Sequence, residues 1–349
     1  MAGLRIASVR RVMGQPQPGG AFGIVLDRLR ENGFAQRGVP RWGRVFAGPY
    51  SDVRELHVAR NGQTVTAFIK ILKPRADTPG ELEATRRNIV REFETLTRVE
   101  RAFSSTPGLS VPQPIACYPD LQALVTHRVD GEPLPRVLSK LGGVPSARTV
   151  DGVTDVVWRV GSWLKVFQTT EASRDPLSLE RMRTYLDARL RPLGELGVCS
   201  PGLRERLLRY FDRRAQEIDS SDLPAVPVHA DFTPENVIVA PGCVTVLDFT
   251  MAKQGARYLD LAHMFMQIEM LKARPWFRPT LIDRATTALL RGFDAALRVE
   301  RPLFELLLLQ NVVCFVVQTA QMRVSGLRAR LAASRVRGRH LKWLEARAG

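Results

Sequence analysis

Short apolar runs with alternating polarity occupy residues 45–72. The run VFAGPYSDVRELHV is followed by Asn61 and Gly62 and then by TVTAFIKIL. Runs of β-branched and aromatic residues around a turn dipeptide are typical of a β-hairpin or meander. The preceding residues are rich in Gly, Arg and Pro and show no sustained period. We therefore expect residues 1–43 to form a partly irregular leader, with regular structure starting near Arg44.

A helical period follows these strands. Counted from Ile89 at the angular spacing of an α-helix, Phe93, Leu96, Val99 and Phe103 fall in one apolar stripe. Among the acidic residues of this segment, Glu92 falls inside the stripe and Glu94 on the opposite side.

The rest of the chain is mainly helical in pattern. An apolar strand, Leu121 to Thr126, leads to a turn at Asp130 and Gly131, and the residues from Tyr258 onward have an almost entirely helical period. The most apolar stretch, Leu303 to Ala320, is interrupted by polar residues, which favours a buried core helix over a membrane span. A small β-rich part followed by a long helical part predicts two lobes.

The stretch from Val226 to Ala262 carries the clearest chemical pattern. It places His229, Asp231 and Asn236 in an HxDxxxxN arrangement. Two short β-runs follow, at 237–240 and 243–246. If they pair across the intervening two-residue turn, Asn236 lies opposite Leu247, and Asp248 then lies beside Asn236.

A carboxylate and a carboxamide oxygen are ligands suited to Mg²⁺, which takes further ligands from substrate phosphates and water. Asp231, five residues before Asn236, could then accept a proton from a hydroxyl nucleophile. These are the parts that phosphoryl transfer from ATP requires. The plain alternative is an acid-rich loop that satisfies its own backbone through Asx-turns.

This stretch resembles the aminoglycoside phosphotransferase-like branch of the protein-kinase-like fold. Its small-molecule kinases carry a similar H-G/A-D-x-x-x-x-N, followed by D-F/W and a later D-L-A. The resemblance implies an α+β bilobal fold with a small β-rich N-lobe and a large, mainly helical C-lobe. It further implies a set of roles: Asp231 as catalytic base, Asn236 and Asp248 as Mg²⁺ ligands, and His229 and Asp260 as structural residues.

The resemblance also requires a lysine on the third strand and a glutamate on the following helix. Lys70, in the apolar run AFIKIL, fits the lysine, and Glu92 fits the glutamate because it lies on the inward stripe. In the family this pair positions the donor phosphates. An edge-strand lysine that reaches water is the alternative for Lys70 alone. The pattern does not separate ATP from GTP.

Three further nucleotide contacts follow from the resemblance. Backbone groups near Thr126 to Arg128 would bond adenine at the hinge between the lobes. The turn AGPYSDV would cover the phosphates, although it has only Gly48 where protein kinases have three glycines. Ser51 in this turn either touches phosphate or is an ordinary turn serine. Gln168 stands where relatives often have histidine.

These features predict four segments along the chain. A leader covers residues 1–43, the N-lobe residues 44–127 and the C-lobe residues 128–321. Residues 322–349 form a basic C-terminal helix or tail.

Composition excludes several classes of protein. The 349 residues are 45% hydrophobic and 25% charged, which argues against wholesale disorder and fibrous repeats. The four cysteines are scattered, with no CxxC pair, and are expected to be reduced thiols of a cytoplasmic protein.

Charge bears on the acceptor. The formal net charge is +16, and the chain from Phe265 onward holds 15 Lys and Arg against six Asp and Glu. A polycationic antibiotic would need an acidic cleft. We therefore expect a neutral or anionic hydroxylated small molecule, such as a sugar or a glycan of the cell envelope or of polysaccharide metabolism. An antibiotic phosphotransferase is the alternative, and a non-catalytic nucleotide-binding regulatory protein is an alternative of another class.

Residues 322–349 are rich in arginine, with apolar residues interleaved. This pattern fits either a basic amphipathic helix on an anionic membrane surface or a solvated terminal helix or frayed tail. Nucleic acid is disfavoured as a partner because no aromatic stacking platform accompanies the charge.

Overall fold

The computed structural model describes residues 9–10, 20–35, 39–60, 62–172, 175–200, 202–321 and 327–348. The chain divides into two compact units. The small unit combines the chain up to Gly131 with Ala240–Ala252, and the large unit combines Glu132–Val239 with Lys253–Gly349. The small unit is β-rich and the large unit is mainly helical, so the predicted α+β class is confirmed.

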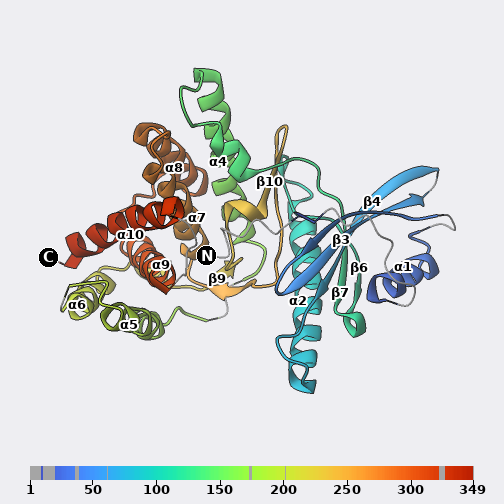
Figure 1. Ribbon diagram of the computed structural model, residues 1–349, viewed down its shortest axis with the longest axis horizontal. Coiled ribbons are helices and arrows are strands. Elements are labelled where there is room, and N and C mark those ends of the chain that lie inside the picture. Colours follow the sequence, from blue (N-terminus) through green and yellow to red (C-terminus); the bar gives the residue numbers. More distant parts are fainter. Residues whose placement is uncertain are drawn as a thin grey trace. The chain divides into compact units, whose positions relative to one another are not determined.

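An antiparallel sheet forms the centre of the small unit (Figure 1). The predicted hairpin is present, with ladder pairs from Ser51 opposite Leu72 to Arg60 opposite Gln63. Gly62 closes its turn with a φ of 76°, which glycine adopts without strain. In the order β1-β2-β3-β4-β7-β6, the strands are Val9–Arg10, Arg41–Ala47, Ser51–Arg60, Gln63–Leu72, Ala123–His127 and Pro114–Tyr118.

Helix α2 (Pro79–Phe103) carries the predicted apolar stripe. Thr78 caps it by accepting a hydrogen bond from the Glu81 N–H. Ile89, Leu96 and Val99 are buried, and the helix packs against β6 and β7. The amphipathic period read from the sequence therefore corresponds to the face that this helix buries.

The expectation of an irregular leader was wrong for part of its length. Residues Ala21–Glu31 form helix α1, and β2 already begins at Arg41. Val25 and Leu29 of α1 are fully buried in a cluster with Leu56 and Ile69 of the sheet. Phe22, Val25, Leu26 and Leu29 have helical spacing over about two turns, but α1 is short and lies in a Gly- and Arg-rich window, where this period was missed. Residues 1–8, 11–19 and 36–38 of the expected leader lie outside the described residues.

A short parallel pairing brings a later segment into the small unit. Strand β11 (Cys243–Val246) pairs with β5 (Leu109–Ser110), and Val244 lies opposite Leu109. The residues that follow β11, up to Ala252, therefore belong to the small unit.

The large unit is built from helices and short strands. Its helices are α3 (Leu134–Ser139), α4 (Ala147–Phe167), α5 (Leu179–Glu195), α6 (Leu203–Ala215), α7 (Leu259–Glu269), α8 (Pro279–Phe293), α9 (Pro302–Gln321) and α10 (Leu327–Ala348). Its strands are β8 (Glu132–Pro133), β9 (Val226–Val228), β10 (Val237–Ala240) and β12 (Lys253–Gly255). The two runs predicted at 237–240 and 243–246 are thus both strands. β12 pairs with β9, and β10 pairs with β8.

Helices α4 and α8 approach each other very closely (Figure 1). The contact is made by glycine on both sides: a Cβ on Gly161 would lie 2.1 Å from the Leu289 carbonyl oxygen, and one on Gly292 would lie 2.0 Å from the Trp158 carbonyl oxygen. Ser162 Oγ adds a hydrogen bond of 3.1 Å to the Gly292 oxygen. Direct contact between the backbones of α4 and α8 therefore sets the distance between these helices.

Helix α9 is the predicted core helix of the large unit. It is the one helix of the described chain that is long and apolar enough to span a membrane, and 78% of its apolar window is buried inside the protein. Its buried Glu305 forms ion pairs with Arg214 of α6 at 2.9 Å and Arg347 of α10 at 3.0 Å. A buried charge needs such partners, and here they connect three helices.

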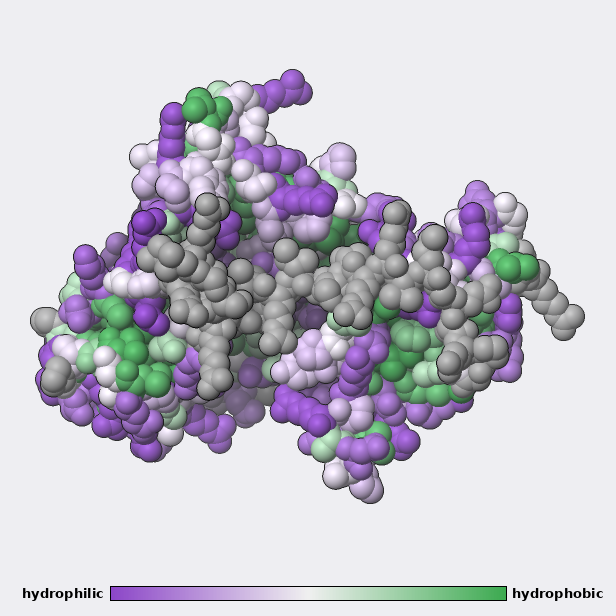
Figure 2. Space-filling model, viewed as in Figure 1, coloured by the Kyte–Doolittle hydropathy of each residue, from purple (hydrophilic) through white to green (hydrophobic). Residues whose placement is uncertain are grey.

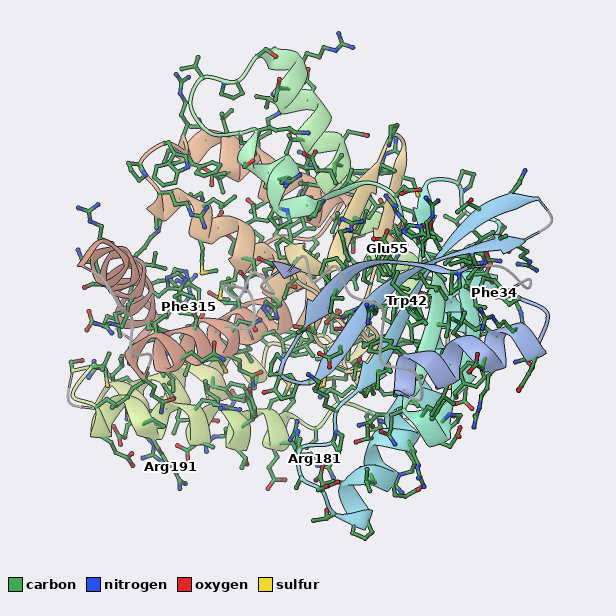
Figure 3. All side chains as sticks on the ribbon, turned by 45° about the vertical axis from the view of Figure 1, so that its right-hand side comes forward. Phe34, Trp42, Glu55, Arg181, Arg191 and Phe315 are labelled. Carbon is green, nitrogen blue, oxygen red and sulfur yellow. The ribbon has the colours of Figure 1, made fainter. Side chains whose placement is uncertain are left out.

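The C-terminal helix α10 packs onto α9 and α6. Leu344 is fully buried, and the His340 ring lies 5.0 Å from the ring of Phe315, which Figure 3 labels on α9. The end of the chain is therefore a packed helix and not a frayed tail. Leu344 is one of the apolar residues behind the membrane-surface expectation, and it is used for packing inside the unit.

Candidate active site

Lys70 of β4 stands at the centre of a charged cluster in the small unit. Its Nζ lies 2.9 and 3.1 Å from the two carboxylate oxygens of Glu92 and 2.6 Å from Asp248 Oδ1. Successive strand residues point to opposite faces, so Ile69 faces the α1 cluster while Lys70 faces α2. Glu92, chosen above from its place on the helical stripe, is 2% exposed and is the helix residue that meets this lysine.

The cluster holds the lysine in its charged form. Burial alone would lower the pKa of Lys70, but the negative charges of Glu92 and Asp248 outweigh burial and raise that pKa above its ordinary value. The ammonium is therefore a permanent positive charge. Such a charge is what binding of a phosphate group requires.

Thr250 belongs to the same cluster and was not among the predicted site residues. Its Oγ1 lies 2.7 Å from Lys70 Nζ, 3.0 Å from Glu92 Oε2 and 2.6 Å from Asp248 Oδ1. Asp248 has a φ of 64°, a left-handed conformation that is uncommon for aspartate and is found at functional sites. This backbone conformation places the side chains of Asp248 and Thr250 at the same lysine. Their spacing in the sequence does not indicate this shared contact.

Hydrogen bonds of the sheet limit which backbone groups of residues 126–128 could bond adenine. The N–H groups of His127 and Arg128 donate to the carbonyls of Gln113 and Thr66, at 2.9 and 3.0 Å. While the sheet is intact, these two N–H groups are engaged, so an adenine contact in this segment would use other backbone groups. Thr126 pairs with Phe68, so its side chain lies on the same face as Lys70, one step along the strands.

Ser51 is the first residue of β3, directly after the turn that the family would place over the phosphates. Its carbonyl accepts a hydrogen bond of 2.9 Å from the Gly48 N–H. A Cβ on Gly48 would lie 3.0 Å from that carbonyl oxygen, so the turn is tight. Ser51 thus closes the turn through its backbone.

A second buried carboxylate lies near the hinge and was missed. The Glu55 side chain is 5% exposed, and Arg44 and Arg128 pair with it at 3.1 and 3.2 Å (Figure 3). Burial acts to raise the pKa of Glu55, but the hydrogen bonds from Arg44 outweigh it and lower that pKa. A Cβ on Gly43 would lie 2.6 Å from Glu55 Oε2, so glycine makes room for the carboxylate. Arg128, which was predicted to contact the nucleotide, therefore also forms an ion pair with Glu55 inside the small unit.

In the large unit, Asp231 and Asn236 are held by one short loop. Asn236 Nδ2 donates to the Asp231 backbone oxygen at 2.9 Å and to its carboxylate Oδ2 at 3.1 Å. Pro234–Asn236 forms a single 3₁₀ turn between the two residues, and this turn sets their distance. Because the amide nitrogen faces Asp231, the amide oxygen of Asn236 points away from it.

Asp260, at the start of α7, stabilises this loop through two hydrogen bonds. Its carboxylate accepts hydrogen bonds from the N–H groups of His229 at 2.6 Å and Ala230 at 2.8 Å. Ala230 has a φ of 61°, a strained value for a residue with a Cβ, and the two bonds hold it there. The fully buried His229 ring packs edge-on against Phe232, with ring centres 6.0 Å apart.

Gln168 ends α4 next to this loop's supporting elements. Its Nε2 donates to the Arg257 carbonyl at 2.6 Å. It therefore ties the end of α4 to the segment that leads into α7.

The titration of Asp260 gives a testable pH dependence. Burial raises its pKa from an ordinary value of 3.8 to about 7, and the charge of Asp231 adds to the rise, although the two N–H donors oppose it. A carboxyl group whose pKa rises on folding binds more protons in the folded state. Its contribution to the free energy of unfolding therefore falls as pH rises from 3.8 to about 7.

We expect Asp260→Asn to reduce the loss of unfolding free energy between about pH 5 and about pH 8. Urea denaturation of both proteins at the two pH values measures that loss. An equal loss in wild type and variant would show that Asp260 does not titrate in this range.

The two groups lie in different units and offer complementary chemistry. The small unit supplies a cation with carboxylates around it, and the large unit supplies a carboxylate and a carboxamide on one loop. No group of three or more His, Cys, Asp and Glu side chains suited to a metal ion occurs among the described residues. The available ligands are hard oxygen atoms, which favour Mg²⁺ over transition metals.

A β-sheet lysine paired with a helix glutamate, together with an HxDxxxxN loop in a helical unit, defines a protein-kinase-like phosphotransferase. The model of the phosphotransferase enzyme family matches residues 58–303, and the chain belongs to that family. It is accordingly an enzyme of the class that phosphorylates hydroxyl groups.

Solved structures share this fold at low sequence identity. A candidate aminoglycoside phosphotransferase of Ralstonia eutropha superposes with a TM-score of 0.59 at 15% identity, covering 93% of this chain and 97% of its own. A choline kinase of Cryptosporidium parvum gives 0.53 at 11% identity, covering 93% and 96%. A glucosamine kinase gives 0.54 at 18% identity, covering 95% and 88%. No curated protein sequence matches the chain significantly.

Proposed function

We propose that this enzyme transfers the γ-phosphoryl group of ATP to a hydroxyl group of a neutral or anionic small molecule in the cytoplasm. The preferred acceptor class is a sugar or a glycan of the cell envelope or of polysaccharide metabolism. The observation that supports the reaction is the contact of Lys70 with the buried Glu92 and with the more exposed Asp248. Among the solved relatives, an aminoglycoside phosphotransferase contains ADP and an amicoumacin kinase contains AMP-PNP with Ca²⁺.

Lys70 would bind the donor phosphates, and Glu92 would hold the ammonium in place. Three further residues would border the nucleotide. Thr126 lies on the hinge strand β7, Arg128 follows that strand, and Ser51 follows the turn expected over the phosphates.

Mg²⁺ fits the oxygen donors that the chain offers. Asp248 presents a carboxylate held in an uncommon backbone conformation, and Asn236 keeps its amide oxygen free of Asp231. We assign these two residues as metal ligands. When bound, the ion would neutralise charge on the transferring phosphate.

Asp231 would act as the base that accepts the proton of the acceptor hydroxyl. The Asn236 amide donates to Asp231 Oδ2 and so fixes the direction of the carboxylate. Asp260 and His229 would have a structural role: the hydrogen bonds to Asp260 fix the backbone of the residues just before Asp231. Positioning and electrostatics would supply most of the rate.

The acceptor class rests on charge and on a cavity in the large unit. Many arginines of this unit are neutralised by ion pairs, such as Arg183 with Asp212 and Arg301 with Asp222. At the start of α5, a cavity of about 1000 Å³ is lined by side chains of mixed charge and several hydroxyl groups: Asp175, Ser178, Glu180, Arg181, Thr184 and Tyr185. The hydroxyl and charged groups of this lining would hydrogen-bond a polyhydroxylated acceptor.

The outer surface of α5 adds positive charge. Arg181 and Arg191 are exposed there, and Figure 3 shows both projecting from this helix. In Figure 2 the margin of the unit around α5 and α6 is mostly hydrophilic. Arg191 pairs with Asp187 on the same helix, so the support that this surface gives to an anionic acceptor rests on Arg181.

A screen for acceptor-dependent release of ADP tests the proposal. Monosaccharides, amino sugars, phosphorylated or carboxylated sugars, choline, ethanolamine and aminoglycosides would be compared at equal concentration with Mg·ATP. We expect ADP release above background with a sugar or glycan. Turnover of an aminoglycoside or macrolide alone would establish the antibiotic phosphotransferase instead. Binding of Mg·ATP with no turnover of any acceptor would favour the regulatory protein.

A further inference from the structure

Lys70 has more hydrogen-bond acceptors than protons. An ammonium group has three protons. Four oxygen atoms lie within hydrogen-bond distance of Lys70 Nζ: two on Glu92, one on Asp248 and one on Thr250. The lysine can therefore give up one of these oxygens, for a phosphate oxygen or any other ligand, and still donate all its protons.

The Thr250 hydroxyl likewise has fewer protons than acceptors, with one proton and two carboxylate acceptors. Glu92 Oε2 lies 3.0 Å from Thr250 Oγ1, and Asp248 Oδ1 lies 2.6 Å from it. The hydroxyl can donate to one of them at a time, while it accepts from Lys70 at 2.7 Å. It is therefore the one group of this cluster that both accepts from the lysine and donates to a carboxylate.

We propose that Thr250 is a positioning residue for Mg·ATP: its O–H bond, which has both Asp248 and Glu92 as acceptors, would turn to Glu92 and so release Asp248 to hold a metal ion. This inference rests on the proposed function, in which Asp248 is a metal ligand. In the form described here Asp248 is engaged by Lys70 and Thr250. When Asp248 leaves them, Thr250 keeps a carboxylate acceptor in Glu92 and keeps Lys70 in place.

Valine tests this role because it has the shape of threonine without the hydroxyl. In Thr250→Val, Lys70 loses a neutral acceptor and Glu92 loses a donor. The ammonium and the two carboxylates are then linked by ion pairs alone, so Asp248 is held more firmly by Lys70 and is released to the metal ion less readily. Thr250→Ser keeps the hydroxyl and should behave like wild type.

Thr97→Val is a matched control. Thr97 also lies in the small unit, on the same helix as Glu92, but its hydroxyl donates only within the helix, to the Phe93 carbonyl at 2.8 Å. The same chemical change is therefore made without touching the Lys70 cluster. Thermal unfolding of each variant shows whether it is folded, and Thr250→Ala carries the same prediction if valine does not fit.

Titration calorimetry of Mg·ATP binding is the measurement. We expect Thr250→Val to bind Mg·ATP about tenfold more weakly, Thr250→Ser to bind within about twofold of wild type, and Thr97→Val to bind like wild type. The KM for ATP should rise in the same order, with the KM for the acceptor unchanged.

Three results would overturn different statements. If wild type binds Mg·ATP and Thr250→Val binds it equally well, Thr250 has no positioning role. If serine fails to restore binding, the hydroxyl is not the group responsible. If wild type itself does not bind Mg·ATP, the proposed function fails, whatever the variants do.

Discussion

Asp231→Asn is expected to lower acceptor-dependent phosphoryl transfer about a thousandfold or more while the protein stays folded. A general base contributes about 10² to 10⁴ in rate, and a carboxamide cannot accept the proton. The side-chain oxygen of asparagine can still accept the hydrogen bond that Asn236 now gives to Asp231 Oδ2. The loop geometry is therefore preserved, and the chemistry alone is removed.

The measurement is the rate of ADP release with the acceptor identified by screening, together with Mg·ATP binding and thermal unfolding. Asp155→Asn is the matched control, because Asp155 pairs with Arg159 on the surface of α4 in the same unit. We expect the control to retain wild-type turnover. Unchanged turnover in Asp231→Asn, with the protein pure and folded, would remove Asp231 from the catalytic role.

Gly161→Ala is expected to lower the free energy of unfolding by about 3 kcal/mol, the upper end of the usual cost of overpacking. The added Cβ would lie 2.1 Å from the Leu289 oxygen and 2.9 Å from the Phe293 nitrogen. Both are backbone atoms of α8, so no side chain can rotate away. The two helices would have to separate along their whole contact.

Gly152→Ala on the same helix provides the comparison. An added Cβ there meets nothing within 4 Å. Because alanine favours a helix over glycine by up to about 1 kcal/mol, this variant should be slightly more stable than wild type. Urea denaturation of both variants gives the free energies. If both variants were equally stable, helix propensity would matter here and the close contact of α4 with α8 would not.

Much of the site could be read from the sequence because its signals are local. The alternation of β4 and the stripe of α2 are regular, so the side on which Lys70 and Glu92 lie follows from simple periodicity. The 3₁₀ turn between Asp231 and Asn236 spans a fixed number of residues. The spacing of the motif therefore already indicates that Asp231 and Asn236 lie close together.

Other features depend on contacts between distant segments. Thr250 shares a lysine with Glu92 only because β11 pairs in parallel with β5, which brings residues 240–252 into the small unit. The buried Glu55 is paired by Arg44 from β2 and by Arg128 from the segment after β7. No local pattern contains this information, since the partners are far apart in the chain.

The prediction for the hinge stays a prediction, and backbone hydrogen bonding limits the groups that could serve it. The N–H groups of His127 and Arg128 are taken by carbonyls of neighbouring segments, and strand register alone decides this. Helix α1 was missed for a related reason: its short apolar stripe becomes meaningful only when Val25 and Leu29 meet the sheet.

The sequence by itself determined the family, the α+β class and the identity of the main chemical groups, because these depend on residue type, short spacing and periodicity. The tertiary structure decided which groups share hydrogen bonds: that Lys70 has four acceptors, that Thr250 has a choice of two, and that α10 is packed and not frayed. Hydrogen bonds and packing act over a few ångströms in space, and only the folded chain sets which residues come that close.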